Sequence, residues 1–128
     1  MIYLDSSVLV AHLLSEDRKP PASLWDGPLV SSRLLEVEAW TALHARGKAG
    51  LGGRLSLLLA RLSVLEMEEE VLERATRPFQ MPVRALDAIH LATAEYLREL
   101  GEHVSIATYD GRMAAVAREM DFETIPLD

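Results

Sequence analysis

The sequence has no cysteine and no asparagine, and aromatic residues make up only 5% of it. Without cysteine there is no disulfide bond and no thiolate metal site, and we expect a protein of the cytoplasm. No apolar run approaches the roughly 20 residues that a membrane-spanning helix needs, so we expect no membrane association. Asp5 interrupts the first apolar run, which argues against a secretory signal segment.

The chain also lacks an excess of basic residues, because its net charge at pH 7 is −7. This charge argues against a protein that coats nucleic acid non-specifically, since such binding is built from unpaired cations. It does not exclude an enzyme acting on nucleic acid, because bound cations offset the charge of metal-binding carboxylates. A basic partner would also suit an acidic protein. The length of 128 residues predicts one domain with its own core, which is aliphatic.

Short apolar segments alternate with helix-patterned segments along the whole chain. We predict strands at residues 2–4, 29–31, 64–67, 104–108 and 124–126. We predict helices at residues 8–14, 22–26, 33–46, 54–62, from 68 onward, 83–100 and 111–120, the first capped by Ser6 and Ser7. This alternation is typical of the α/β class, with a parallel sheet covered on both faces. In such folds ligands bind beyond the carboxyl ends of the strands, where the strand order reverses.

Two acids stand where predicted strands end. Asp5 follows the first strand and Asp110 follows the strand at 104–108. Both should therefore point into the crevice at the carboxyl edge of the sheet. The structural alternative is helix capping, which Asp5 could share with the serines after it. For Asp110, which directly precedes Gly111 and a helix, capping is the stronger interpretation when it is taken alone.

Two further acids lie inside helix-patterned segments. Glu38 has mostly apolar neighbours three and four residues away, whereas Glu36 can pair with Arg33 at the surface, so Glu38 is the embedded acid. Asp87 is either a functional acid or a favourable charge near a helix N-terminus. His90, three residues further on, fits a packed side chain with one hydrogen bond better than a metal ligand or base.

Burying a lone carboxylate costs several kcal/mol unless positive charge compensates it. Four acids spread over a small domain are tolerated if they converge on a divalent cation. The residues that we expect to converge are Asp5, Glu38, Asp87 and Asp110.

The segments around these acids resemble the four motifs of the PIN domain, and within it the VapC ribonucleases of bacterial and archaeal toxin–antitoxin pairs. The resemblance runs from end to end of the chain, with one acid in each motif. The matching segments are MIYLDSSVLV at residues 1–10, VSSRLLEVE at 30–38, RALDAIHLA at 84–92 and ATYD at 107–110. Each motif alone is weak, but four in order at the family's spacing are fairly specific.

The resemblance implies a single PIN domain over residues 1–128, a three-layer α/β/α sandwich around a parallel sheet. It implies one or two Mg²⁺ or Mn²⁺ ions, which suit oxygen ligands, and an RNA substrate. It also implies the toxin of a toxin–antitoxin pair, with a VapB-like antitoxin as partner and a homodimer as a further expected assembly.

The resemblance also implies roles for individual residues. Asp5 and Asp87 would bind the metal directly, and Asp110 would do so closely or through water. Glu38 would orient a water molecule or complete the metal shell. Ser6 or Thr108 would hold a carboxylate or phosphate oxygen. Hydrolysis would then proceed by attack of a metal-activated water on the phosphate.

Three other interpretations remain open from the residues alone. A phosphotransferase of the haloacid-dehalogenase type needs a second aspartate where this chain has Ser7. A response-regulator receiver needs a late lysine, and no lysine follows Lys48. A non-catalytic PIN-like scaffold would only bind a partner, but its acids would have no reason to be intact.

The antitoxin should act as a mixed inhibitor. A cation from its tail would enter among the four acids, and its apolar residues would lie on exposed surface of the early helices. We expect that surface at residues 8–14, Leu24, Trp25 and Trp40.

Overall fold

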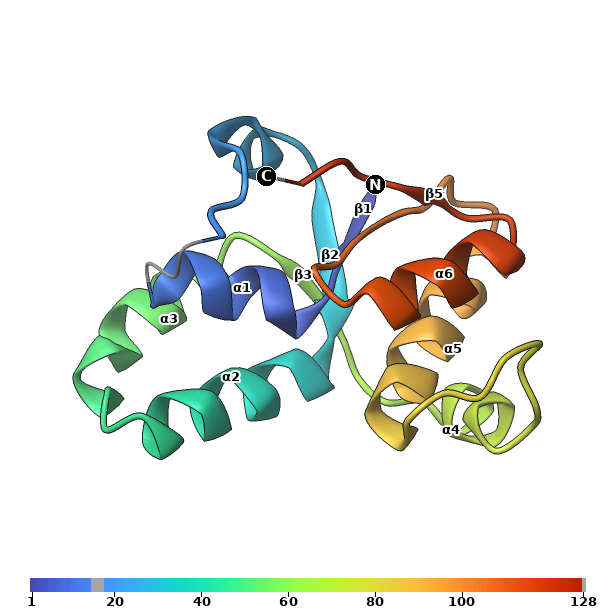
Figure 1. Cartoon of the computed structure of the whole chain (residues 1–128), viewed down its shortest axis with the longest axis horizontal. Helices are drawn as coiled ribbons and strands as arrows, with labels where there is room; N and C mark the ends of the chain where they lie inside the picture. Colours follow the sequence, from blue (N-terminus) through green and yellow to red (C-terminus); the bar gives the residue numbers. More distant parts are fainter. Residues whose placement is uncertain (15–17, 128) are drawn as a thin grey trace.

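The computed structural model describes residues 1–14 and 18–127, and within them five short parallel strands form the centre (Figure 1). They are β1 (Ile2–Leu4), β2 (Leu29–Ser32), β3 (Ser63–Leu65), β4 (Ser105–Ala107) and β5 (Glu123–Thr124). Their order in the sheet is β3-β2-β1-β4-β5. The chain thus builds outward from β1 through β2 and β3, then returns to the other side of β1 for β4 and β5. The predicted α/β fold with a parallel sheet is confirmed.

Helices cover the sheet in two groups (Figure 1). The helices are α1 (Ser6–Leu13), α2 (Arg33–Ala45), α3 (Gly52–Leu59), α4 (Glu69–Ala75), α5 (Ala85–Glu99) and α6 (Gly111–Glu119), with short 3₁₀ helices η1 (Ala22–Asp26) and η2 (Ala49–Leu51). The first three lie on one side of the sheet and the last three on the other. No helix in the described ranges is long and apolar enough to cross a membrane.

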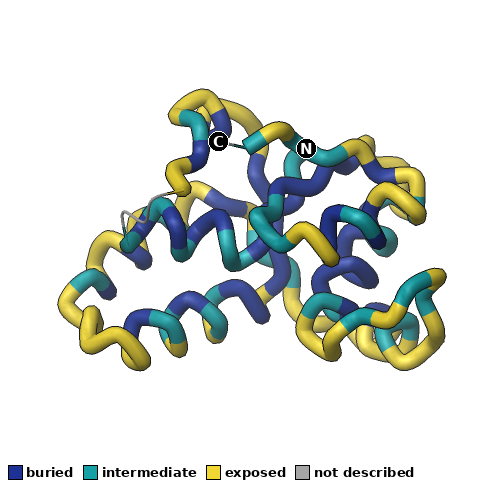
Figure 2. The backbone as a smooth tube through the Cα atoms, viewed as in Figure 1, coloured by how far each residue is buried: buried dark blue, intermediate teal, exposed yellow. Residues whose placement is uncertain are grey.

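The two sides correspond to the alternation of side chains along each strand. Leu4 of β1 packs in a cluster with α1, α2 and α3, together with Leu29 and Ala107. The preceding residue of β1, Tyr3, faces the opposite way and packs with α5 and α6. Figure 2 shows the result, with the central strands buried and the far ends of the helices exposed. Because both faces are covered, β2 and β4 are buried along their whole length, including the serines Ser31, Ser32 and Ser105.

Three helices at the carboxyl edge of the sheet begin with a capping side chain. Asp5 is the N-cap of α1 and accepts a hydrogen bond from the amide of Ser7, so the predicted caps Ser6 and Ser7 lie inside the helix instead. Ser32 caps α2, and Asp110 caps α6. The reason for the correction is geometric: Asp5 directly follows the strand and keeps extended backbone angles, which an N-cap requires.

The predicted apolar docking surface on the early helices is wrong. The side chains concerned lie in the core that α1, η1, α2 and α3 share with the sheet: Val8, Leu9, Leu13, Leu24 and Trp25. Trp40 is partly buried and packs against that cluster, with its ring over Gly52 at the start of α3. These side chains belong to the core because three helices and η1, rather than one helix, cover this face of the sheet.

Candidate functional site

The site begins where β1 and β4 end side by side. Leu4 pairs with Ala107, and the amide of Asp5 donates to the Ala107 carbonyl over 3.0 Å. Asp5 and Thr108 are therefore the next residues of two neighbouring strands. The chain leaves these strands toward different helices, so β1 and β4 flank the point where the strand order reverses. Such a switch point is where open parallel sheets bind ligands.

Asp5 is held firmly by one of its two carboxylate oxygens. The side chain is nearly buried, and its Oδ2 accepts from Ser7 Oγ at 2.6 Å and from Thr108 Oγ1 at 2.8 Å. Ser7, rather than the Ser6 of the sequence prediction, is thus the serine that contacts this acid, while Thr108 contacts it as expected. Within the described residues, no donor lies within hydrogen-bonding distance of Asp5 Oδ1. One oxygen is therefore fixed and the other is available to a ligand.

Asp110 uses one oxygen in the same way. Its Oδ1 accepts from the amides of Arg112 and Met113 at 2.9 and 3.1 Å, which caps α6. Its own amide donates to Thr108 Oγ1 at 3.0 Å. Thr108 therefore bridges Asp5 and Asp110. The capping interpretation of Asp110 is correct, and capping also fixes the carboxylate beside Asp5.

Asp87 enters from the first turn of α5. Burial raises the pKa of this half-buried carboxyl above its ordinary value, and the negative charges of Asp110 and Asp5 raise it further. No hydrogen bond to the Asp87 side chain is found among the described residues. A carboxyl that is partly desolvated beside two others is easier to ionise when a cation is present. The fold has thus brought Asp87 toward the strand-end acids, and no Lys or Arg of the described residues forms an ion pair with it.

Glu38 joins the group through a buried histidine, His90, which the sequence did not identify as a site residue. His90 is fully buried on α5, and its Nε2 lies 2.5 Å from Glu38 Oε1 and 4.0 Å from Asp5 Oδ1. The other ring nitrogen, Nδ1, lies 2.7 Å from the hydroxyl of Tyr3. His90 is packed, as predicted, but it has two side-chain hydrogen bonds instead of one. The sequence carried one signal for this role: His90 follows Asp87 by three residues, which places both on the same side of a helix.

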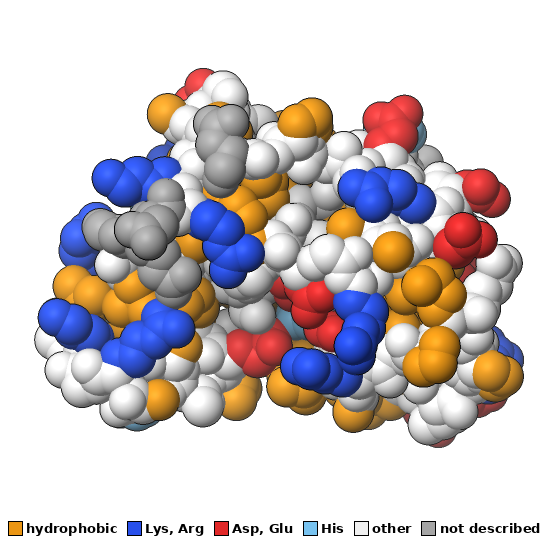
Figure 3. Space-filling model, in the orientation of Figure 1, with side chains coloured by type: hydrophobic (Ala, Val, Ile, Leu, Met, Phe, Trp, Pro, Cys, Tyr) orange, Lys and Arg blue, Asp and Glu red, His pale blue; other side chains and the backbone are white. Residues whose placement is uncertain are grey.

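Besides the burial of Asp87, the charges of Asp110, Asp5 and Glu38 all act on this carboxyl and raise its pKa, so the four acids occupy one region of the molecule, which we call the acidic hollow. Figure 3 shows acidic side chains gathered near the middle of this face, where the first turns of α1, α2 and α6 approach one another, with Lys and Arg side chains beside them. Within residues 1–14 and 18–127, neither Lys nor Arg forms an ion pair with any of the four acids. In the same ranges, no three acidic or histidine side chains stand close enough to be a ready-made metal site.

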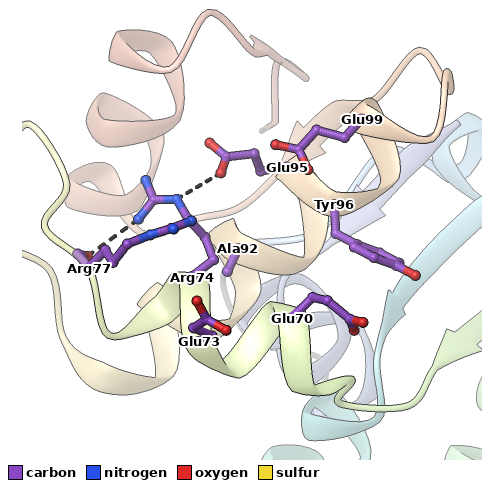
Figure 4. Close-up of a pocket in the computed structure, with 8 residues that line it drawn as sticks. All are labelled: Glu70, Glu73, Arg74, Arg77, Ala92, Glu95, Tyr96 and Glu99. Carbon is purple, nitrogen blue, oxygen red and sulfur yellow. Dashed lines mark hydrogen bonds and ion pairs between the residues drawn. The ribbon is translucent and has the colours of Figure 1, made fainter.

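Acids elsewhere in the molecule are balanced differently. A cavity of about 180 Å³ between α4 and α5 is lined by several glutamates, but Glu95 there pairs with Arg74 at 2.7 Å (Figure 4). Arg74 also lies over the ring of Phe79 at 4.1 Å. On α2, Glu36 pairs with Arg33 at 3.2 Å, as predicted. Asp5 differs from Glu95 and Glu36 because it is buried and no Arg or Lys pairs with it in the part of the chain that the structure describes.

The sequence matches a family model described as PIN domain over residues 2–119, a range that contains all four acids. The chain belongs to the PIN-domain family. Within that family, Ribonuclease VapC46 of Mycobacterium tuberculosis is 36% identical over 129 residues, covering 97% of this chain and 95% of that protein. The predicted resemblance to VapC-type PIN ribonucleases is therefore confirmed. Membership in the PIN-domain family also excludes the two other folds considered from the sequence, the haloacid-dehalogenase-type phosphotransferase and the response-regulator receiver.

Solved VapC structures share the fold. The VapC20 toxin of Mycobacterium tuberculosis, described as cleaving the sarcin–ricin loop, matches with a TM-score of 0.70 at 21% identity over 90% of this chain and 94% of that one. VapBC2 of Rickettsia felis, bound to a DNA fragment from its promoter, matches with a TM-score of 0.73 at 13% identity over the full length of both chains. At these identities the likeness concerns the PIN fold alone.

Proposed function

We propose that this VapC-family chain, one PIN domain over residues 1–128, hydrolyses RNA with a divalent cation and is the toxin of a cytoplasmic toxin–antitoxin pair. One observation carries the proposal. Four carboxylates from four separate segments meet at the switch point of a parallel sheet, and none has an Arg or Lys partner within the described residues. Such an arrangement is costly for the fold and is relieved by a cation.

The donor set fits Mg²⁺ or Mn²⁺. Hard divalent cations bind carboxylate oxygens, and Mg²⁺ commonly touches one or two carboxylates while keeping its waters. Asp5 offers Oδ1, Asp110 offers Oδ2, and Asp87 offers both oxygens, because none of these accepts a hydrogen bond within the described residues. The bound ion would supply positive charge beside the phosphate and make water a better nucleophile at neutral pH.

The chain's own residues would position this chemistry. Ser7 and Thr108 donate to Oδ2 of Asp5 and would thereby keep its other oxygen oriented toward a bound ion. Glu38 would accept a proton from the attacking water and orient it toward the phosphate. Arg84 and Arg112 are exposed next to Asp87 and Asp110 in sequence, so they would contact phosphates on either side of the cleaved bond.

The antitoxin would use the early helices, as predicted, but through exposed groove residues instead of the apolar side chains that are buried in the core. Two adjoining grooves, of about 330 and 240 Å³, share His12 and Arg54 and lie between α1, η1 and α3. Their rims carry Lys19 and Arg61, and Leu57 is 72% exposed. This mixture of cations and apolar side chains fits an acidic segment with an apolar anchor. A separate cation of the antitoxin would enter the acidic hollow and compete with metal. A homodimer is the second assembly that we propose.

Two substitutions two residues apart test the active site. Glu38→Gln should lower RNA cleavage by about 10²–10⁴-fold, as expected for loss of an acid–base group. Glu36→Gln is the matched control, because that acid lies on the same helix and pairs with Arg33 at the surface. Cleavage of a structured RNA should require Mg²⁺ or Mn²⁺ and stop in EDTA. Equal cleavage in EDTA would refute the proposal, and a scaffold without catalysis would show no metal-dependent cleavage at all.

A further inference from the structure

A buried hydrogen-bonded chain leads from the sheet to the acids. Tyr3 and His90 are both fully buried, and their rings meet edge to face with centroids 5.7 Å apart. The chain continues from Tyr3 Oη to His90 Nδ1 and from His90 Nε2 to Glu38 Oε1, at 2.7 and 2.5 Å. Neither Tyr3 nor His90 has a solvent-exposed surface that could touch RNA. Their effect on the site must therefore pass through Glu38.

One proton position in this chain follows from its neighbours. An ionised Glu38 carboxylate can only accept, so the proton in its contact with His90 belongs to Nε2. At the other ring nitrogen, the Tyr3 hydroxyl can donate to Nδ1 or accept from it, because Ser31 and Thr93 lie near that hydroxyl and donate to the Leu4 and Ile89 carbonyls at 2.7 Å. His90 holds Glu38 through Nε2–H in either case.

We propose that His90 is a positioning residue: Tyr3 holds its ring through Nδ1, and its Nε2–H holds the Glu38 carboxylate in place beside Asp5. The same N–H lies 4.0 Å from Asp5 Oδ1, so a side chain here contacts one acid and approaches a second. The two hydrogen bonds fix the orientation of the ring, and the ring in turn fixes the direction of the Glu38 carboxylate.

The metal-related part of this inference rests on the proposed function, but its first test does not. In metal-free wild-type protein labelled with ¹⁵N, the ring nitrogens of His90 report the tautomer directly by NMR. We expect the ring to carry a proton on Nε2. A ring protonated at Nδ1 alone would overturn the assignment. This measurement uses the wild-type protein, so it gives a result even if every His90 substitution unfolds the protein.

Substitutions test the positioning role by Mn²⁺ binding, measured by calorimetry on metal-free protein. His90→Phe keeps a ring but removes both hydrogen bonds, and should weaken Mn²⁺ binding about 10- to 100-fold, the usual effect of losing a residue that orients a ligand. His90→Gln offers an amide N–H and a carbonyl at a similar separation, and should restore much of the affinity. Tyr3→Phe, which removes one hydroxyl, should weaken binding less than His90→Phe. Leu97→Val, a core change elsewhere on α5, should lower thermal stability without changing Mn²⁺ affinity.

Kinetics separate this inference from the proposed function. Since His90 is buried, His90→Phe should lower kcat for RNA cleavage and leave KM for RNA nearly unchanged. If the folded His90→Phe protein binds Mn²⁺ and cleaves RNA as the wild type does, or if His90→Gln is as impaired as His90→Phe, the positioning role is refuted while the nuclease proposal stands. If the wild type shows no metal-dependent cleavage, the nuclease proposal fails, and the tautomer and the Mn²⁺ affinities still decide the role of His90.

Discussion

Asp110 combines helix capping with a proposed metal-binding role, and two substitutions at this residue separate the two. Its Oδ1 caps α6 through two backbone amides. Asparagine caps as well as aspartate, so Asp110→Asn should keep the stability of the fold while losing the charge. Asp110→Ala should lose both and lower the free energy of unfolding by about 1 kcal/mol. RNA cleavage and urea unfolding of both variants give the comparison. Full activity in Asp110→Asn would contradict the metal-binding role.

Asp87 makes the stability of the metal-free protein depend on pH. Burial, and then Asp110 and Asp5, raise the pKa of this carboxyl in the folded state. The folded protein therefore keeps the proton to higher pH than the unfolded chain, and its stability falls as pH rises from the ordinary aspartate pKa through the raised one. Asp87→Asn should thus be more stable than wild type at neutral pH, and the difference should shrink in acid. Urea unfolding in EDTA across this range measures it. A difference that stays constant with pH would contradict the crowding of the acids.

The packing of α2 against α3 depends on one of two adjacent glycines. A Cβ on Gly52 would lie 2.3 Å from the Trp40 ring, whereas nothing lies within 4 Å of a Cβ on Gly53. Gly52→Ala should lower the free energy of unfolding by about 1–3 kcal/mol, the range for overpacking a core. Gly53→Ala is the matched control and should be neutral or stabilise by up to about 1 kcal/mol, because alanine favours a helix. Thermal or urea unfolding of the two variants distinguishes them, and equal stabilities would contradict the described packing.

At the scale of the whole molecule, the proposed antitoxin surface reaches the last turn of α1 at His12, whereas the acids lie at its N-cap, Asp5, so the two regions should respond to different changes. Leu57→Asp should weaken binding of the co-expressed antitoxin about tenfold or more, as loss of an apolar anchor does, without altering RNA cleavage by the free toxin. Leu100→Asp is the control, because that residue is 64% exposed at the end of α5, away from α3. Reversing the charge of the antitoxin cation that enters the hollow should release activity while most binding persists. Loss of the complex in that variant would contradict the division between anchor and cation.

The order of strands and helices, the α/β class and the family membership could all be predicted from the sequence. These features are local or periodic: the apolar strand at residues 2–4, the capped helix after Ser32 and the helix at Asp87 each follow from neighbouring residues. The placing of Asp5 and Asp110 at one edge of the sheet also followed, because carboxyl ends of parallel strands share that edge. The predicted boundaries differ from the observed ones by one to three residues where a helix or strand end depends on its tertiary neighbours.

Only the tertiary structure decided which side chains serve the acids and which fill the core. Ser7, not Ser6, contacts Asp5, because the first turn of α1 directs one hydroxyl toward Thr108 and Tyr109 of another strand end. Glu38 and His90 are 52 residues apart and meet only because α2 and α5 both begin at the same edge of the sheet. The apolar side chains of the early helices likewise form core rather than a docking surface, because other segments of the chain cover them. Periodicity identifies an apolar face, but what covers that face depends on segments far away in the chain.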